Sequence, residues 1–367
     1  MNSKNISEMS LADAFNSINP IWSKIIVDKG LNPSLLPGWL KCVCDAFELS
    51  DKVKVFIAYK ENNIIGIIPY YIVQKNIMGL SKRCIELATN IVTYHQELIA
   101  LQSPMELMEN FLEHLEMNTG WDIFVIKDLW MEGNTYKTLT RPTTTFKLTT
   151  YPSESSPYLA LTETWKDLVS SKQKKFRYKV NRREKELSDN DDLESTWFKS
   201  GDSCDELIEC ILHIEQKSWK VNENMDITSR PIETTYYKNL IPYLSSNKLL
   251  LANVLKFKGT AIAYNLCYQM NGMVGQIKTS FDNTFHELSP GAMIIEEALR
   301  HYYSQGFVEF DFLGDIMPHK MAWTKNTRPH ETITLYNRRS KGLFFYLLVR
   351  SRKFIRKVTN TRIRKPD

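Results

Sequence analysis

A Ser-Pro-Gly motif, Ser289-Pro290-Gly291, stands directly before the predicted helix AMIIEEALRHYY. Serine is a good N-cap, proline suits the first helical turn, and glycine lets another backbone approach closely. The free N–H groups and the positive end of the helix dipole at such a start can hold a diphosphate or a carboxylate. The same residues can equally form a capped helix start without a ligand. Ser289, Pro290, Gly291, Ala292 and Met293 are therefore a candidate anion-binding segment.

Lys278 and Asp282 bracket the end of the predicted strand MVGQIKTSFD, and alternation puts both on one face. A lysine there can bind a phosphate or a carboxylate, and Asp282 can orient an amine. The same pair can also be a loose ion pair at a strand end, worth under about 1 kcal/mol.

Asp311 lies between two phenylalanines in the predicted strand FVEFDF. A buried carboxylate needs a partner or has a raised pKa, and a raised pKa suits a general base. Asp311 faces opposite the phenylalanines by alternation, so an exposed position is equally open. Attack of an amine on a thioester needs such a base, together with an oxyanion donor such as a backbone N–H at a strand bulge.

Glu215, Trp219 and Lys220 are spaced i, i+4 and i+5 on a predicted helix. Glu215 and Trp219 share a face and can line an acceptor pocket. In the structural alternative the helix is amphipathic and Trp219 anchors it in the core. Trp219 is expected to be structural in either case, so Glu215 is the stronger functional candidate.

The densest basic run of the body, residues 172–185, puts Lys175, Lys179, Arg182 and Arg183 near one helical stripe. Such a stripe can hold a sugar-nucleotide diphosphate, a polyanionic lipid carrier or RNA, or it can be a solvated face. No RNA-binding motif accompanies it, so a nucleic-acid role is not expected.

The composition excludes several classes of protein. Length suggests about two domains for 367 residues. Only 14 residues are glycine, well below the usual share of about 7%, and no Rossmann, P-loop, nucleophile-elbow or zincin motif occurs. The six cysteines form no C-x-x-C pair and the seven histidines are scattered, so no metal site is predicted. Scattered cysteines and the lack of a signal-peptide pattern predict a cytoplasmic protein.

Positive charge gathers at the C-terminal end. Residues 338–367 carry eleven Lys/Arg and one Asp, a net +10 against +5 for the whole chain, so the rest carries −5. Four apolar residues of this segment can share one helical face: Leu343, Leu347, Phe354 and Ile355. Residues 342–365 can therefore contact an anionic membrane surface from the cytoplasmic side. Alternatively, a terminal helix packs its Phe-Leu face on the body and a solvated tail follows.

Expected helices and strands alternate along both halves. Helices are expected at 34–49, 105–117, 165–187, 203–219, 232–244 and 292–301. The first half has a hairpin in VKVFIAYKENNIIGIIPYYIV, and the second has a meander with turns at Lys258-Gly259 and Asn271-Gly272. The Pro/Ser-rich stretch 151–157 is typical of a linker or an inter-domain crossover. The similar order of elements suggests a duplicated unit.

Several stretches together carry a family resemblance: Trp165 with FRYKVNRR (176–183), IEQKSWK (214–220), KTSFD (278–282) with LSPG (288–291), FDFLGD (310–315) with Lys320 and Trp323, and, in the first half, PGW (37–39) with GIIP (66–69). On these residues the chain resembles the BioF2-like/CelD group of GNAT-fold acyltransferases, which are similar to the FemAB peptidyl transferases. The likeness covers about residues 35–336.

The resemblance implies an α+β fold of two tandem GNAT-like domains with mixed, largely antiparallel sheets. The expected parts are an N-terminal GNAT-like domain (1–150), a linker or crossover (151–160), a C-terminal acyltransferase domain (161–337) and a basic helix or tail (338–367). The ordinary GNAT pyrophosphate loop is absent, and ELSPGAM (287–293) stands in its place. The donor therefore stays open between acyl-CoA and the aminoacyl-tRNA of FemAB relatives.

The implied reaction transfers an acyl group from acetyl-CoA or another acyl-CoA to an amine or hydroxyl. The implied acceptor is a sugar nucleotide, polysaccharide or other envelope precursor, and no metal is required. Asp311, Asp282 or Glu215 would be the base, Trp219 would line the acceptor site, and four cations would bind anionic substrate groups: Arg177, Arg182, Lys278 and Lys320. The alternatives are a FemAB-like aminoacyl-tRNA-dependent transferase and a non-catalytic component of a polysaccharide-synthesis assembly.

Overall fold

The computed structural model describes residues 5–77, 79–92, 95–142, 146–338 and 342–350. The chain forms two compact units. Unit 1 comprises Met1–Leu40, Leu49–Glu154 and Pro329–Asp367, and unit 2 comprises Lys41–Glu48 and Ser155–Arg328. The chain passes between the units within α2 (Pro37–Ala46), after Glu48, and within two strands, β7 (Lys147–Ala160) and β13 (Thr327–Tyr336). The stretch expected to be a linker or crossover is part of the regular strand β7.

Unit 1 contains a mixed sheet in the order β1-β2-β3-β4-β6-β13-β7, and β5 pairs with β3. Its further strands are β1 (Asn5–Ser10), β2 (Lys54–Lys60), β3 (Asn63–Ile77), β4 (Leu80–Leu87), β5 (Ile99–Ala100) and β6 (Ile123–Trp130). Its helices are α1 (Leu11–Asp28), α3 (Pro104–Asn118) and α4 (Asn134–Leu139), with short 3₁₀ turns at η1 (Pro33–Leu35) and η2 (Ala88–Ile91); α2 (Pro37–Ala46) spans the boundary between the units. Strands β4 and β6 run parallel, whereas β1 to β4 form an antiparallel meander and β6 is antiparallel to β13.

Helix α3 supplies much of the core of unit 1. Leu107, Phe111 and Leu115 recur at i, i+4 and i+8 and are fully buried, as one apolar stripe requires. Phe111 makes edge contacts with Phe56 of β2, at 5.2 Å between centroids, and with Phe124 of β6, at 5.5 Å.

A cluster around Glu8 of β1 ties the sheet of unit 1 to α3. Glu8 accepts hydrogen bonds from Lys54 Nζ (2.6 Å) and Tyr70 Oη (2.6 Å), and His114 Nε2 lies 2.7 Å from its second oxygen. Burial acts to raise the pKa of Glu8, but these three partners outweigh it and lower the pKa to about 2.

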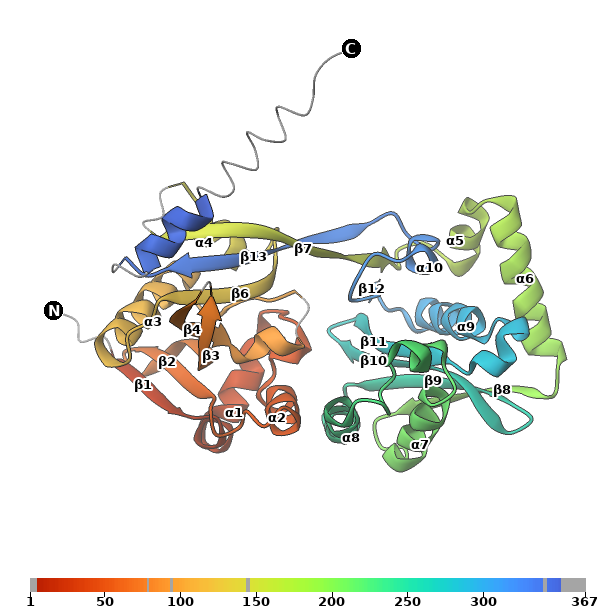
Figure 1. Cartoon of the computed structure of the whole chain (residues 1–367). Coiled ribbons are helices and arrows are strands. Elements are labelled where there is room, and N and C mark those ends of the chain that lie inside the picture. Colours follow the sequence, from red (N-terminus) through yellow and green to blue (C-terminus); the bar gives the residue numbers. More distant parts are fainter. Residues whose placement is uncertain (1–4, 78, 93–94, 143–145, 339–341, 351–367) are drawn as a thin grey trace, which may run out of the picture. The chain divides into compact units, whose positions relative to one another are not determined.

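Unit 2 has the sheet order β7-β12-β11-β10-β9-β8. The strands are β8 (Leu193–Lys199), β9 (Leu250–Phe257), β10 (Thr260–Met270), β11 (Met273–Phe281) and β12 (Glu309–Asp311). The helices are α5 (Trp165–Ser171), α6 (Lys174–Asp189), α7 (Cys204–Glu215), α8 (Pro231–Ser246), α9 (Pro290–Gln305) and α10 (Pro318–Met321), with 3₁₀ turns η3 (Trp219–Glu223) and η4 (Asn283–Leu288) (Figure 1).

The two predicted hairpin turns of unit 2 are present. Lys258-Gly259 has φ angles of 49° and 75°, and Asn271-Gly272 has 52° and 78°. Left-handed residues at both central positions fit the twist of the flanking strands. The expected helix 165–187 is instead two helices, α5 and α6, which are separated at extended Lys172 and Gln173.

Neighbouring residues of β10 reach helices on opposite faces of the sheet. Tyr264 hydrogen-bonds to Glu215 of α7, whereas Asn265 bonds to Tyr302 of α9. Because side chains alternate along a strand, α7 and α9 cover opposite faces. No helix in the described ranges is long and apolar enough to cross a bilayer.

The two units repeat one arrangement. In unit 1, α3 connects the meander strand β4 to β6, which runs parallel to β4. In unit 2, α9 connects β11 to β12, which runs parallel to β11. Both helices begin with Ser-Pro, at Ser103-Pro104 and at Ser289-Pro290. The duplication predicted from the sequence is therefore visible in the topology.

Candidate active site

Strand β11 has an open edge in unit 2. It pairs with β12 only at Met273–Gly275, whereas it pairs with β10 as far as Phe281. The register with β10 skips Ile277, which makes it the extra residue of a β-bulge. Beyond Gly275 no described strand pairs with the β12 side of β11. Such a bulge leaves backbone groups outside the ladder, and an N–H there can stabilise a developing oxyanion.

A buried ladder of amide side chains supports the bulge from the α9 face. Gln276 Nε2 donates to Asn265 Oδ1 (2.8 Å), and Asn265 Nδ2 donates to Asn253 Oδ1 (3.2 Å). Asn253 Nδ2 in turn donates to Glu297 (2.7 Å), which also accepts from Trp197 Nε1 (2.9 Å). Burial raises the pKa of Glu297. Buried and bonded along its length, the ladder fixes β9, β10 and β11 against one another at the bulge.

Sequence reasoning missed this ladder. Asn253 and Asn265 each stand in an otherwise apolar strand, KLLLANVLKF and TAIAYNLCYQM. A polar residue in such a run is seldom buried without partners, and that was the available signal.

The start of α9 adjoins the open edge. Ser289 adopts a left-handed conformation (φ 56°, ψ 46°), and its side chain makes no capping hydrogen bond. Ser289 is therefore the N-cap residue, as the sequence indicates, but its side chain does not cap the helix, because a capping side chain needs an extended backbone. The first turn carries no acidic residue. A Cβ built on Gly291 would lie 2.7 Å from the Phe281 ring, so glycine lets the helix start approach the end of β11.

The equivalent helix start in unit 1 is closed by its own side chains. Ser103 is extended (φ −102°) and accepts a hydrogen bond from Glu106 N. Glu106 places an acid in the first turn, where Ala292 stands in unit 2. The positive helix end of unit 1 is thus compensated by protein groups, while that of unit 2 is left to a ligand or solvent.

The equivalent strand opening in unit 1 is also filled. Beyond the β4–β6 pairing, Asn90 of η2 donates to Val125 O (2.9 Å) and accepts from Lys127 N (3.1 Å). Gln96 donates to Asn90 Oδ1 (3.3 Å). These side chains occupy the backbone groups of β6 that a ligand would otherwise meet. Of the two matching openings, unit 2 therefore holds the candidate site.

Glu215 is fully buried, and both of its carboxylate oxygens are bonded. Oε1 accepts from Tyr264 Oη (2.6 Å) and Lys220 Nζ (3.2 Å), and Oε2 accepts from Ile227 N (3.0 Å). Lys220 Nζ also donates to Thr279 O of β11 (2.9 Å), and burial lowers the pKa of Lys220. Glu215 therefore holds the segment after α7 against β11. This is a positioning role, and it leaves no oxygen for a substrate proton.

Asp311 is buried and not exposed, so the exposed alternative is wrong. Its Oδ1 accepts from Ser156 Oγ (3.0 Å) and Leu313 N (2.8 Å), and its Oδ2 pairs with Arg328. Burial acts to lower the pKa of Arg328, but Asp311 and Glu309 outweigh it and raise that pKa. The Asp311 carboxylate is therefore committed to an ion pair beside β12, which suits a structural role better than a general base.

Asp282 is the one of the three carboxylates with an oxygen free of hydrogen bonds among the described residues. Oδ1 accepts from Thr284 N (2.9 Å) and Oγ1 (2.6 Å), whereas buried Oδ2 has only Lys217 Nζ at 3.8 Å. Ser280 Oγ, two residues earlier on β11, is likewise buried without a hydrogen bond in the described chain. Buried polar atoms of this kind need a partner, so this end of β11 suits a polar ligand.

The remaining candidates do not gather at one point. Lys278 Nζ pairs with Glu233 of α8 (3.1 Å). Lys320 is buried and donates to Leu313 O (2.6 Å), and burial lowers its pKa. Trp219 is 37% exposed in η3, beyond the end of α7, so it is not the predicted core anchor. Arg177 lies exposed on α6 and donates to Ser170 O (3.0 Å). Arg182 is also exposed on α6.

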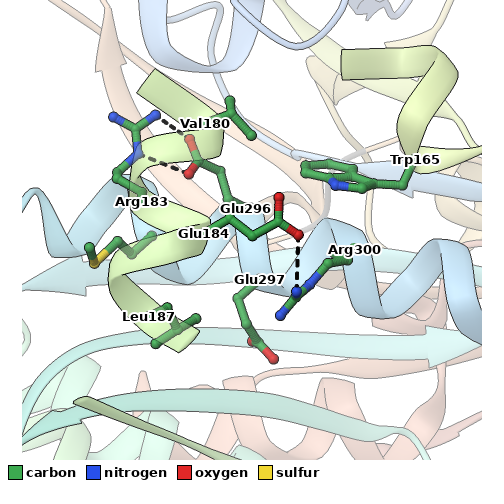
Figure 2. Close-up of a pocket in the computed structure, with 9 residues that line it drawn as sticks. Trp165, Val180, Arg183, Glu184, Leu187, Glu296, Glu297 and Arg300 are labelled. Carbon is green, nitrogen blue, oxygen red and sulfur yellow. Dashed lines mark hydrogen bonds and ion pairs between the residues drawn. The ribbon is translucent and has the colours of Figure 1, made fainter. Parts of the chain in front are cut away.

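The predicted basic stripe on α6 is divided. Arg183 turns inward and forms a buried two-bond pair with Glu296 of α9 (Figure 2). Glu184 pairs with Arg300 across the same cleft, at 3.1 Å. The cleft between α6 and α9 encloses about 20 Å³. That volume suits about one water molecule and is far too small for an acyl donor. No group of three His, Cys, Asp or Glu residues within the described ranges could hold a metal ion.

Comparison with known proteins agrees with the fold of the two units. Residues 174–321 match the model of the acetyltransferase (GNAT) domain family. The structure is similar to FemX, with a TM-score of 0.62 and 10% identity over 94% of this chain and 99% of FemX. A conserved protein of unknown function from Bacteroides thetaiotaomicron VPI-5482 gives 0.55 and 13%, covering 91% of this chain and 100% of that one. No curated protein matches the chain.

A third similar structure is the C-terminal domain of a protein described as a lysylphosphatidylglycerol synthetase from Agrobacterium fabrum. Its TM-score is 0.55 and its identity 11%, over 92% of this chain and 95% of that domain. The identities are low, so these likenesses show the fold alone.

The structure therefore has two units of the same arrangement and a fold similar to that of FemX, with a match to the GNAT acetyltransferase domain family in unit 2. The match to the GNAT acetyltransferase domain family covers residues 174–321, which lie within unit 2. The predicted α+β tandem fold is confirmed. The narrower resemblance to the BioF2-like/CelD group stays a prediction.

Proposed function

We propose that unit 2 transfers an acyl group from acyl-CoA to an amine or hydroxyl of an envelope precursor. One observation carries the proposal: the bulged, open edge of β11 lies beside a helix start that no side chain caps. The bulge offers a donor for the thioester oxygen, and the helix start offers positive potential for the CoA diphosphate. The matching features of unit 1 are occupied by protein groups, so one donor binds per chain.

The reaction needs few groups. The acceptor nitrogen attacks the thioester carbon, the oxyanion forms at the bulge, and the C–S bond then breaks to release the CoA thiolate. Asp282 Oδ2 takes the proton of the acceptor, and the thiolate takes one from solvent. Asp282 is favoured over Glu215 and Asp311 because it retains a carboxylate oxygen without a hydrogen bond.

The segment after α7 supports an acceptor with a sugar ring and an anionic group. Lys217 and Trp219 belong to this segment and are both substantially exposed. The backbone of Lys217 adjoins the end of β11, since Asn283 N donates to Lys217 O (3.0 Å). An indole face packs on a sugar ring, and an ammonium pairs with a phosphate. A nucleotide-linked amino sugar has both groups and is therefore an acceptor of this kind.

The test measures CoA release from acetyl-CoA with a panel of amino-sugar nucleotides. Asp282→Asn keeps the Oδ1 acceptor that binds Thr284 but loses the base, so the rate at neutral pH should fall about 10²- to 10⁴-fold. Thr284→Val is the matched control, because it removes the hydroxyl bond to Asp282 and leaves the carboxylate. Unchanged turnover in Asp282→Asn would remove Asp282 from the chemistry.

A second candidate donor is aminoacyl-tRNA. The outward residues of α6 support it, since six cations on that helix are exposed: Lys174, Lys175, Arg177, Lys179, Arg182 and Lys185. The affinity for RNA bound there would fall steeply between 50 and 200 mM salt. The steepness would increase roughly with the number of phosphates that the cations neutralise. Filter binding of charged tRNA to wild type and to Lys175→Ala/Lys179→Ala/Arg182→Ala separates the donors. Salt-sensitive binding that the triple variant loses would favour tRNA over CoA.

A further inference from the structure

The helical residues 342–350 pack on unit 1 with one side only. They follow β13 and appear in blue beside it in Figure 1. Phe345 is 3% exposed and joins a small apolar cluster with Cys84, Ile123 and Tyr336. Lys82 Nζ lies 2.9 Å from the centroid of the Phe345 ring. The inner side of this helix is therefore fixed to the sheet by packing and by a cation–π contact.

The other side of the same helix is apolar and uncovered. Leu343 is 36% exposed, Phe344 50% and Leu347 57%. Leu343 and Leu347 are spaced i, i+4 and share a face, and Phe344 adjoins them. Single exposed apolar residues are common, but three large ones within five positions form a patch that is typical of an interaction surface. We call Leu343, Phe344 and Leu347 the outer patch.

Two cations lie at Tyr346 of the same helix, and a basic sequence follows the helix. Arg350 Nη1 donates to Tyr346 Oη (3.1 Å), and Lys147 Nζ lies 5.9 Å from the Tyr346 ring. The sequence after Arg350 carries seven Lys/Arg and one Asp in its last 17 residues. These 17 residues, including the predicted face partners Phe354 and Ile355, lie outside the described residues. Three apolar side chains next to such a basic segment match the surface of an anionic bilayer. There the acyl chains are apolar and the headgroups over them are negatively charged.

We propose that the outer patch docks unit 1 on an anionic membrane surface. The patch inserts at the boundary between headgroups and acyl chains, and the cations lie among the headgroups. A second copy of the chain fits less well, because two strongly basic segments would meet. Three side chains also cover much less than the roughly 800 Å² per partner of a stable interface. This docking is independent of the acyl-transfer chemistry.

Co-sedimentation of the full chain with vesicles tests the proposal. We expect binding to phosphatidylcholine vesicles with about 30% phosphatidylglycerol, weak binding to phosphatidylcholine alone, and release at high salt. Leu343→Ser/Phe344→Ser/Leu347→Ser should weaken binding at least tenfold. Ile21→Ser/Val27→Ser is the matched control, because these apolar residues of α1 are comparably exposed.

A second variant isolates the electrostatic part. Replacing Arg352, Lys353, Arg356 and Lys357 by Gln should weaken binding by roughly fivefold for each charge lost near the surface. Thermal unfolding checks that each variant is folded. If the triple variant is not folded, Leu347→Ser alone replaces it in the binding assay. Equal binding by the patch variant and the wild type would overturn the proposal. So would equal affinity for neutral vesicles, or light scattering that shows a patch-dependent dimer and no lipid binding.

Discussion

A single acid at the start of α9 should close the donor site of unit 2. Ala292 is the third residue after Ser289, and its counterpart in unit 1 is Glu106. Ala292→Glu therefore gives α9 the charge that α3 already has. The new carboxylate favours the positive helix end by about 0.3–1 kcal/mol, so the protein should unfold at an equal or higher temperature. Lower stability cannot then explain a loss of binding.

The same carboxylate opposes the diphosphate of acyl-CoA. The repulsion between this one negative charge and the two of the diphosphate, about 7 Å apart at an effective dielectric constant of about 40, weakens binding by about 2 kcal/mol. That free energy corresponds to an increase of roughly 30-fold in Kd. Gly291 is less suitable for this test, because any side chain there meets the Phe281 ring.

The assay is calorimetric titration with acetyl-CoA at low salt, with Ala292→Gln as the neutral control of equal size. We expect Ala292→Gln to bind within about threefold of wild type and Ala292→Glu to bind about 30-fold more weakly, with the gap narrowing as salt is added. Equal Kd values for Ala292→Glu and wild type would refute donor binding at this helix start. Equal weakening by Gln and Glu would show that size, and not charge, is responsible.

Three further results are expected. Gln276→Leu leaves Asn265 Oδ1 buried without its 2.8 Å donor, which should cost about 1–3 kcal/mol in urea unfolding and lower kcat about tenfold with little change in KM. Arg183→Met leaves Glu296 buried and unpaired and should cost about 3 kcal/mol, most of it restored by adding Glu296→Leu; a stable single variant would contradict this. Glu8 has a folded pKa of about 2, below its usual 4.5, so its partners stabilise the fold above pH 4.5 and this stabilisation is lost as pH falls towards 2. The stability gap between wild type and Glu8→Gln should shrink over that range, and a constant gap would oppose the assignment.

Local patterns predicted the elements of this fold well where the backbone itself sets the geometry. Asn271-Gly272 and Lys258-Gly259 form the turns of the unit 2 meander because residues that accept positive φ stand between apolar runs. The prolines of the 151–157 stretch indicated a linker or crossover; the chain does change unit there, between Glu154 and Ser155, but it does so within the regular strand β7. Proline marks a loop only when no sheet edge is available to receive it.

The sequence indicated several residues of the candidate site, but it did not show which of them could act in the chemistry. Ser289 and Gly291 stand at the start of α9 and Asp282 directly follows β11, whereas Lys278 pairs with Glu233 of α8. Whether a carboxylate is a base depends on partners far away in sequence. Asp311 is occupied by Arg328, which no local spacing reveals.

Long-range contacts also changed the roles of Arg183 and Trp219. Arg183 shares a predicted stripe with exposed cations, but the packing of α9 on α6 draws it to Glu296. Trp219 has core-like spacing after Glu215, but α7 ends at Glu215 and the turn that follows leaves the indole exposed. In both cases tertiary packing overrode a helical pattern that extended over too few turns to be decisive.

Titration of the wild-type chain with acetyl-CoA tests the central claim most directly. We predict saturable binding at one site per chain, because the opening in unit 2 is free and the matching opening in unit 1 is filled by Asn90 and closed by Ser103. Two equal sites per chain would contradict the assignment to unit 2. No heat with acetyl-CoA, longer acyl-CoAs or CoA itself would contradict the CoA-dependent reaction.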